Sequence, residues 1–335
     1  MSIRIAILGA GIMGGDHARI IAEDVPGAVL QVVCDASESR ARSVADSCNA
    51  IDVSTDPLAV IARVDVDAIL IATPDDSHVG LTLAAIAARK PVLCEKPLAP
   101  NIDDCLKVMA EEVRLNHRFV QLGFMRRFDP SYTEMKSAVT SGLLGRPLMM
   151  HNFHRNVVAP AGFTGQMAVT NSAPHEFDIA RFVLGTNYAA ISVFQPISGK
   201  PSATGTPVFI VLETISGQLV NVEIHNNATY GYDVRGELVG ETGSIFLSAP
   251  VDARINSNFR AFERYPADWR PRFAEAYRKQ NKAWLKSIQT GIPSTIAANA
   301  WDGYWATLTA QAGITALIEA CKIKIESVER PALYR

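Results

Sequence analysis

The sequence predicts an α/β fold in which a doubly wound parallel sheet is followed by an α+β domain with a largely antiparallel open sheet. Up to about residue 123, short β-branched apolar runs alternate with amphipathic stretches of helical length. After Gly123, strand-like runs follow one another with glycine-containing turns between them. The 335 residues suffice for two domains of ordinary size. We predict a first domain over residues 1–123 and a second over 124–335.

In the first domain, predicted strands and helices alternate along the chain. The predicted strands are Ile3–Leu8, Val29–Cys34, Ala50–Val53, Ala68–Ala72, Pro91–Cys94 and Phe119–Leu122. The predicted helices are Met13–Glu23, Ser37–Asp46, Pro57–Arg63, Ser77–Arg89 and Ile102–Leu115. This alternation is typical of a parallel sheet with helices on both faces.

The second domain combines helices with consecutive strands. Predicted helices are Asp129–Ser141, Pro174–Leu184, Arg272–Thr290 and Asn299–Ala320, and predicted strands are Leu148–His154 and several stretches between Tyr188 and Leu247. If helices cover only one face of this sheet, the other face needs a cover, and a symmetric partner is the usual one. We therefore expect a homo-oligomer, either a dimer or a tetramer.

Composition restricts the function classes. The chain is 48% hydrophobic and 20% charged, with a formal net charge of −2, so it offers no broad attraction to nucleic acid or anionic lipid. Its apolar runs are shorter than the roughly 20 residues that span a membrane, and its five cysteines contain no C-x-x-C pair. We expect a cytoplasmic protein that acts on a small molecule, without nucleic-acid or membrane partners. No His and carboxylate set has the spacing of a metal site.

A glycine-rich segment directly follows the first predicted strand. Gly9, Gly11 and Gly14 fit the pattern G-x-G-x-x-G and lead into the first predicted helix. Gly9 permits a tight turn, Gly11 lets the backbone approach a pyrophosphate, and Gly14 lets helix and strand pack closely. At the helix start, the N–H groups around Ile12 and Met13 hold phosphate oxygens. The segment predicts the dinucleotide-binding loop of a Rossmann domain.

Asp35 supports this interpretation and selects the cofactor. It ends the second predicted strand, 21 residues after Gly14. A carboxylate there accepts hydrogen bonds from the ribose hydroxyls of NAD and repels the additional phosphate of NADP. We therefore predict NAD as the cofactor. In the alternative interpretation, the glycines serve only a turn and Asp35 caps the helix that starts near Ser37.

Polar residues also follow the fourth and fifth predicted strands, at the carboxyl edge where such sheets bind ligands. We predict that Thr73, Glu95 and Lys96 contact the cofactor, Thr73 on its nicotinamide side. The Lys96 ammonium can also donate to a substrate hydroxyl and stabilise a developing alkoxide. The alternatives are a Thr-Pro turn and a surface lysine. His78 suits either a helix start or a ligand contact.

His175 is the candidate base, because an imidazole with a pKa of about 6.5 can take a hydroxyl proton at neutral pH. Asn171 lies four residues earlier and shares its face if both lie on one helix. Asp178 can orient the imidazole or pair with Arg181. The alternatives are that Asn171 belongs to a helix cap and that His175 is a satisfied core histidine.

Taken together, these segments resemble the Gfo/Idh/MocA dehydrogenases, and in particular the members of that family that oxidise inositol. Glu95-Lys96-Pro97 after a Rossmann strand is specific to the family. The other segments that carry the resemblance are Gly9 to Gly14, Gly123 to Asp129, His154 to Asn156, His175 to Asp178 and Tyr230 to Asp233. They span nearly the whole chain in the family's order.

The resemblance implies an NAD-dependent enzyme that oxidises a secondary hydroxyl of a cyclic polyol, with myo-inositol as the first substrate to test. It implies that Lys96, His175 and Asn171 form the catalytic set, and that the polyol pocket is lined by Arg126, His154, Asn156 and Tyr232. Inositol-oxidising members usually have an aspartate at the position of Asn171, and an amide cannot accept a proton. Two alternatives remain: an NAD(P)-dependent enzyme for another sugar or sugar derivative, and a non-catalytic NAD or sugar sensor.

Overall fold

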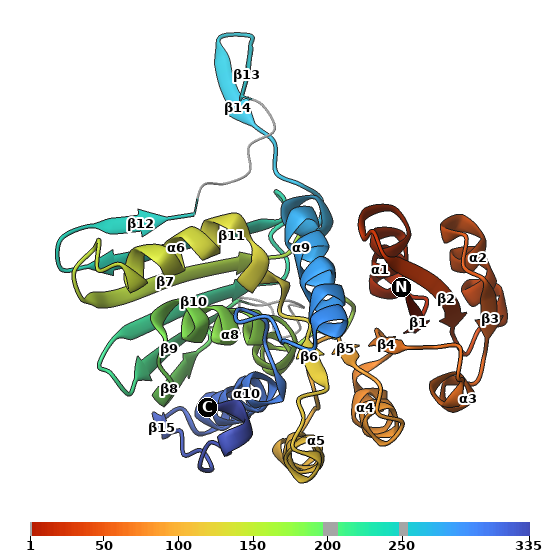
Figure 1. Cartoon of the computed structure of the whole chain (residues 1–335). Coiled ribbons are helices and arrows are strands. Elements are labelled where there is room, and N and C mark those ends of the chain that lie inside the picture. The colour runs from red at the N-terminus through yellow and green to blue at the C-terminus, as the bar shows by residue number, and fades with distance from the viewer. Residues whose placement is uncertain (1, 197–206, 248–253) are drawn as a thin grey trace. The chain divides into compact units, whose positions relative to one another are not determined.

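The computed structural model describes residues 2–196, 207–247 and 254–335, which divide into two compact units (Figure 1). The first unit comprises Met1–Phe128, Glu275–Thr307 and Val328–Arg335, and the second comprises Asp129–Ala274 and Leu308–Ser327. The predicted division after residue 123 stays a prediction, because a functional domain and a compact unit need not end at the same residue.

The first unit is built on a six-stranded parallel sheet with the order β3-β2-β1-β4-β5-β6. Its strands are β1 (Ile3–Leu8), β2 (Ala28–Cys34), β3 (Asp52–Ser54), β4 (Ala68–Ile71), β5 (Val92–Cys94) and β6 (Val120–Leu122). All six predicted strands are confirmed. The strand order reverses between β1 and β4, so the carboxyl ends of these two strands form the switch point where doubly wound sheets bind ligands.

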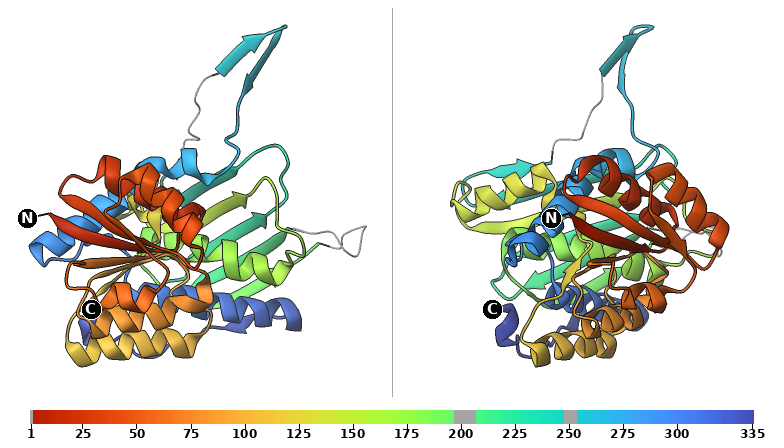
Figure 2. Two further views of the ribbon diagram at one scale, coloured as in Figure 1. Left: turned by 90° about the vertical axis from the view of Figure 1, so that its right-hand side faces the viewer. Right: turned by 45° about the vertical axis from the view of Figure 1, so that its right-hand side comes forward.

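Helices cover both faces of this sheet, as predicted, and Figure 2 shows α1 and α2 on one face and α4 and α5 on the other. The helices are α1 (Ile12–Asp24), α2 (Glu38–Cys48), α3 (Pro57–Ala62), α4 (His78–Ala87), α5 (Ile102–Leu115), α9 (Trp269–Thr290) and α10 (Ala300–Glu319), of which α9 and α10 have parts in both units. Asn281 of α9 contacts His17 of α1, so α9 lies on the α1 side of the sheet. Among the described helices, none is both long enough and apolar enough to cross a membrane.

The second unit is built on a seven-stranded sheet with the order β12-β11-β7-β10-β9-β8-β15. Its strands are β7 (Pro147–Arg155), β8 (Tyr188–Phe194), β9 (Val208–Thr214), β10 (Leu219–His225), β11 (Asp233–Gly240), β12 (Ser244–Phe246) and β15 (Ile323–Lys324). Strand β10 pairs with β7 in parallel, whereas the other pairs in the sheet are antiparallel. The prediction of a largely antiparallel sheet is confirmed, although residues 197–206 of the predicted strand region lie outside the described residues.

Helices α6 (Pro130–Thr140) and α8 (Ala173–Leu184) pack together, and α8 contacts β7 and β10. Side chains along β10 alternate between buried and half-buried, as in a strand with one covered face. A separate hairpin, β13 (Arg254–Ser257) with β14 (Arg260–Glu263), projects from this unit (Figure 1). The sequence did not predict this hairpin.

Candidate active site

The loop after β1 has the geometry that a dinucleotide requires. A Cβ atom at Gly14 would lie 1.8 Å from the Gly9 carbonyl oxygen, so this position accepts only glycine without a shift of the loop. At Gly11, by contrast, no described atom lies within 4 Å of the Cβ position. Gly11 is the N-cap of α1, and no side chain among the described residues caps this helix. The free N–H groups and the open space fit a pyrophosphate.

Asp35 follows β2 and faces this loop. One carboxylate oxygen accepts a hydrogen bond from the Ala10 amide (2.8 Å) and the other accepts from the Ser37 amide (2.9 Å) and from Arg40 (2.9 Å). Burial alone would raise the pKa of Asp35, but these hydrogen bonds outweigh it, so the pKa lies below its usual value. Asp35 is therefore an ionised acceptor beside the loop. The capping interaction with Ser37 is present as well, so the two interpretations of Asp35 do not exclude each other.

The end of β4 contributes Thr73 and the start of α4. The Thr73 hydroxyl accepts a hydrogen bond from Ser77 Oγ (2.6 Å). His78 is 1% exposed, and its ring lies between two backbone carbonyl oxygens, those of Thr73 (2.9 Å) and Pro97 (2.7 Å). His78 is thus a buried histidine held by the backbone on both sides.

The end of β5 contributes Glu95 and Lys96, and the structure shows a buried chain of polar groups behind them. The Asn281 amide nitrogen lies 3.1 Å from His17 Nδ1, and His17 Nε2 lies 3.0 Å from Glu95 Oε1. The Lys96 amide donates to the other Glu95 oxygen (3.3 Å). A Cβ atom at Gly123 would lie 2.7 Å from Glu95 Oε1. No motif in the sequence marks His17 or Asn281, so neither residue was predicted for the site.

Arg126 lies at the carboxyl end of β6, in the short helix η2 (Met125–Phe128). It is 1% exposed. The neighbouring Arg127 forms an ion pair with Asp302 (3.0 Å) in the same unit. A guanidinium at this edge can donate several hydrogen bonds to hydroxyl oxygens, and its role in substrate binding stays a prediction.

In the second unit, the structure brings His154, His175 and Tyr232 together. The His154 ring lies 6.3 Å from the His175 ring and 6.1 Å from the Tyr232 ring, measured between ring centroids. His154 Nδ1 lies 3.2 Å from a carboxylate oxygen of Glu176, which is completely buried. The carboxylate fixes the orientation of the His154 ring. These residues come from β7, from α8 and from the segment before β11, so the fold rather than the sequence spacing makes the cluster.

Asn156 extends this cluster. Its amide nitrogen donates to Asn226 Oδ1 (2.5 Å) and lies 3.4 Å from His154 Nε2. Asn226 Nδ2 in turn donates to Ser172 Oγ (3.0 Å). Asn226 is 3% exposed. Asn226 was not predicted, because it is 70 residues from Asn156 and no local pattern connects them.

Asn171 occupies a different local structure from the one predicted. It lies in a π-helical segment, η3 (Ala168–Ser172), that continues directly into α8. Its side chain is exposed, and its carbonyl oxygen accepts a hydrogen bond from the Thr170 hydroxyl (3.1 Å). Among the described residues, no side chain caps the start of α8 at Ser172. The cap interpretation is therefore wrong, because the helix has no free start at this point. Short π-helical segments are frequent at functional sites.

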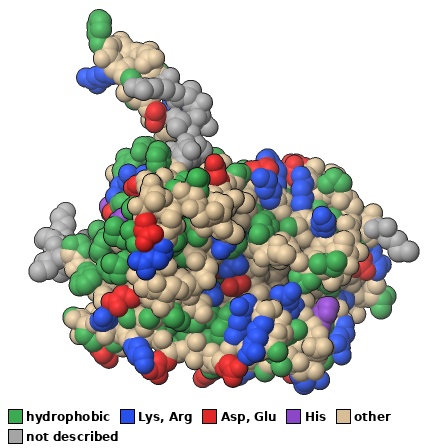
Figure 3. Space-filling view, turned by 60° about the vertical axis from the view of Figure 1, so that its left-hand side comes forward, with side chains coloured by type: hydrophobic (Ala, Val, Ile, Leu, Met, Phe, Trp, Pro, Cys, Tyr) green, Lys and Arg blue, Asp and Glu red, His purple; other side chains and the backbone are tan. Residues whose placement is uncertain are grey.

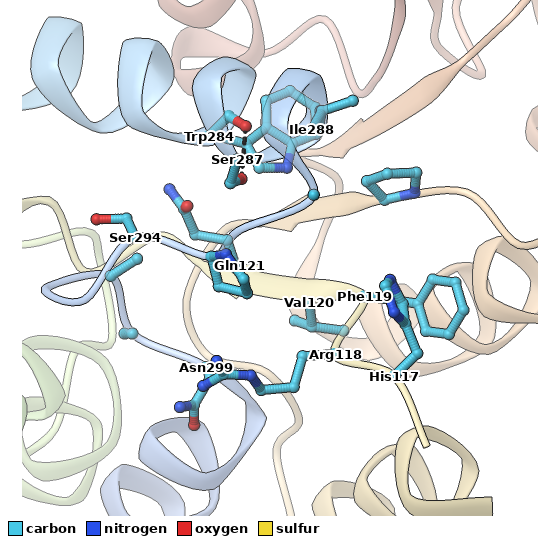
Figure 4. A pocket seen from close by; sticks show the side chains of 15 residues that line it. His117, Arg118, Phe119, Val120, Gln121, Trp284, Ser287, Ile288, Ser294 and Asn299 are labelled. Atoms are coloured by element: carbon cyan, nitrogen blue, oxygen red, sulfur yellow. Dashed lines mark hydrogen bonds between the residues drawn. The ribbon is translucent and has the colours of Figure 1, made fainter. Parts of the chain in front are cut away.

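Each unit contains a hollow. In the second unit, a hollow of about 320 Å³ is lined by Asn156, Asn226, Tyr232 and Trp269, among others. In the first unit, a hollow of about 190 Å³ is lined by side chains such as His117, Arg118, Gln121, Trp284 and Asn299 (Figure 4). The latter includes Pro91 and Phe119, which precede β5 and β6. It therefore lies at the amino ends of the strands, away from the cofactor edge.

Comparison with known proteins bears on both units. Residues 3–124 match the family described as an oxidoreductase family with an NAD-binding Rossmann fold, and residues 132–246 match the GFO/IDH/MocA C-terminal domain. An inositol 2-dehydrogenase of Saccharopolyspora erythraea is 41% identical over 337 residues, covering 100% of this chain and 99% of that protein. An inositol 2-dehydrogenase of Streptomyces avermitilis is 39% identical, covering 98% and 96%.

Solved structures show the same similarity. The myo-inositol dehydrogenase of Lactobacillus casei in complex with NAD(H) and myo-inositol has a TM-score of 0.94 and 26% identity, with 100% of both chains covered. The scyllo-inositol dehydrogenase of the same organism, with bound NAD(H) and scyllo-inositol, has a TM-score of 0.90 and 22% identity, with 98% and 100% covered. The second comparison supports the fold alone.

Proposed function

Because the chain belongs to the GFO/IDH/MocA oxidoreductase family, we propose that it oxidises myo-inositol to 2-keto-myo-inositol with NAD as cofactor. The cluster of His154, Asn156, His175 and Tyr232 carries the choice of a polyol, because it gathers several hydrogen-bonding side chains. Two of them, Asn156 and Tyr232, line the hollow of the second unit. Relatives named inositol 2-dehydrogenase match this chain over nearly its full length. Their similarity supports inositol as the polyol.

Each catalytic residue has a separate task in this proposal. NAD, when bound, supplies the acceptor for the hydride. Gly11 and Asp35 hold its pyrophosphate and ribose, and Thr73 and Glu95 lie at the same sheet edge. Lys96 donates a hydrogen bond to the reacting oxygen and stabilises its negative charge.

The second unit supplies the residue that accepts the proton. His175 takes it from the reacting hydroxyl as a general base. Asn171 holds a neighbouring hydroxyl with its amide but does not accept the proton. This division of roles makes His175 the terminal proton acceptor of the set.

Substrate choice depends on the remaining polar residues. We assign Arg126, His154, Asn156 and Tyr232 to the hydroxyls that do not react. A stereoisomer that leaves one buried donor or acceptor without a partner loses about 1–3 kcal/mol of binding free energy. One inverted hydroxyl is therefore enough to separate related inositols.

The experiment measures NADH formation by the purified protein with myo-inositol, scyllo-inositol and a set of aldoses. We expect the highest kcat/KM with myo-inositol, and we expect Lys96→Met to lose turnover while NAD binding weakens much less. Lys107→Met, which changes an exposed lysine on α5, is the matched control. Turnover of an aldose in place of inositol would move the substrate to another sugar. If the protein binds NAD but turns over no polyol, the proposal that it is an enzyme is contradicted.

We also propose that the chain forms a homo-oligomer through the outer face of the second sheet and the β13–β14 hairpin. Phe194 is 57% exposed and Phe209 is 42% exposed, and they are paired neighbours on β8 and β9. The hairpin carries Phe259 fully exposed, and Figure 3 shows hydrophobic side chains at its tip. A lone hairpin is marginal in water, so a second copy is a suitable cover. Light scattering of the wild type and of Phe209→Asp tests this: a monomeric wild type contradicts it.

A further inference from the structure

We propose that His78 is a permanently charged imidazolium that ties the backbone after β4 to the backbone after β5 and thereby positions Lys96. This proposal concerns a residue outside the catalytic set. Its charge is independent of the proposed function, and only its effect on turnover rests on that function.

The geometry around the ring carries the charge assignment. His78 Nδ1 lies 2.7 Å from the Pro97 carbonyl oxygen, and Nε2 lies 2.9 Å from the Thr73 carbonyl oxygen. A carbonyl oxygen only accepts hydrogen bonds, and a neutral imidazole has only one N–H to donate. In the neutral form, one ring nitrogen would point its lone pair at a carbonyl oxygen at hydrogen-bond distance. Both contacts are favourable only when both nitrogens carry a proton.

The groups that face His78 support this assignment. Burial disfavours the charged ring, but the Cys94 sulfur on β5 and the two carbonyl oxygens outweigh it, so the pKa of His78 lies well above its usual value. The start of α4 opposes the charge through the helix dipole. Two charge-assisted hydrogen bonds are stronger than neutral ones and offset that effect. The carboxylates on the same segment, Asp75 and Asp76, are exposed to solvent.

The position of the two carbonyl groups indicates what the charged ring does. Thr73 lies two residues after the end of β4, and Pro97 is the residue after Lys96. The two strands are neighbours in the sheet, next to the switch point. The imidazolium therefore acts as a cross-link between the backbone on the nicotinamide side and the backbone that carries the catalytic ammonium. Because misplacement of a catalytic group by about 1 Å can reduce turnover on the order of a hundredfold, such a cross-link affects the rate without touching the substrate.

The first experiment reads the charge directly. Neutron diffraction from crystals at a pD of about 8, where an unperturbed imidazole is neutral, locates the deuterons on the ring of His78. We expect a deuteron on both Nδ1 and Nε2. The exposed ring of His117, in the same unit, is the internal reference in the same map. A single deuteron on His78 overturns the proposal, whatever the substrate of the protein is.

The second experiment measures the effect on turnover. His78→Gln keeps one donor and loses the charge, and His117→Gln is its matched control. We expect His78→Gln to lower kcat at least about tenfold, with KM for the polyol and Kd for NAD changed less than about threefold. The control keeps the wild-type kcat. A folded His78→Gln variant with wild-type kcat overturns the positioning role. If this variant does not fold, His78→Asn, which also keeps one donor and loses the charge, is measured in the same way.

Discussion

The candidate site residues fall into two halves, one in each unit, and each half is held by a different kind of contact. In the glycine-rich loop of the first unit, the essential elements are backbone: open space at Gly11, close packing at Gly14, and amides that donate to Asp35. In the second unit, side chains contact side chains. His154 meets Glu176, and Asn156 meets Asn226.

This difference separates binding from selectivity. A backbone cradle recognises the part that all dinucleotides share, the pyrophosphate, and needs only glycines at fixed spacing. A polyol has only hydroxyls to distinguish it, so its site needs donors and acceptors in fixed orientations. Buried partners such as Glu176 supply that orientation. Substitutions in the two halves should therefore impair different properties, cofactor binding in the first unit and recognition of the polyol in the second.

The largest effect is expected within the glycine loop, where two neighbouring glycines should behave differently. Gly14→Ala places a Cβ atom against the Gly9 carbonyl, so we expect the free energy of unfolding to fall by about 4 kcal/mol or more. Gly11→Ala meets open space, so stability should change by less than about 0.5 kcal/mol while Kd for NAD rises at least about tenfold. Denaturant unfolding and NAD titration measure both.

Equal stability of the two alanine variants would contradict the difference between the two glycines, because it would show that the loop can accommodate a Cβ atom at Gly14. Normal NAD binding by Gly11→Ala would show that the pyrophosphate does not approach this glycine.

The next effect is expected in the second unit, at the carboxylate that orients His154. Glu176→Gln replaces the carboxyl group of a fully buried partner with an amide, so kcat/KM for the polyol should fall on the order of tenfold or more. Kd for NAD should stay unchanged, because no cofactor residue is altered. Glu134→Gln, an exposed position on α6, is the control for loss of a carboxylate. A matching loss of NAD affinity would contradict the division of labour between the halves.

The sequence predicted the first unit in detail because its signals are local. The five helices and six strands before residue 123 follow from periodicity, and Ile102–Leu115 has its predicted bounds. The β13–β14 hairpin was missed because its strands are short and β14 is exposed along its length, so that β14 lacks the alternation that marks a half-buried strand.

The site could be predicted only in part, for a related reason. Gly11, Gly14 and Asp35 are marked by spacing. Glu176 and Asn226 act through partners that only the strand register and helix packing bring near, such as Ser172, which is 54 residues from Asn226. The π-helical segment around Asn171 depends on tertiary packing too, so no periodicity predicts it.

A smaller effect is expected at Asp35, and it tests which cofactor the first unit prefers. Asp35→Ala removes the acceptor for the ribose hydroxyls and frees Arg40, which can meet the phosphate of NADP. We expect Kd for NAD to rise about tenfold and Kd for NADP to stay the same or fall. Asp46→Ala, an exposed aspartate on α2, is the control. Equal losses for both cofactors would remove the basis for choosing NAD.

The smallest effect is expected at Asn171, where the resemblance to inositol-oxidising members implies an aspartate. The side chain is exposed and accepts one hydrogen bond from Thr170, and a carboxylate of the same shape can accept that bond as well. Asn171→Asp should therefore fold normally and keep or modestly raise the turnover of inositol, because it adds a second proton acceptor near His175. Asn116→Asp, at the exposed end of α5, is the control for the added charge. A folded but inactive Asn171→Asp would show that the amide has its own role, since only the donor capacity of the side chain is lost in this change.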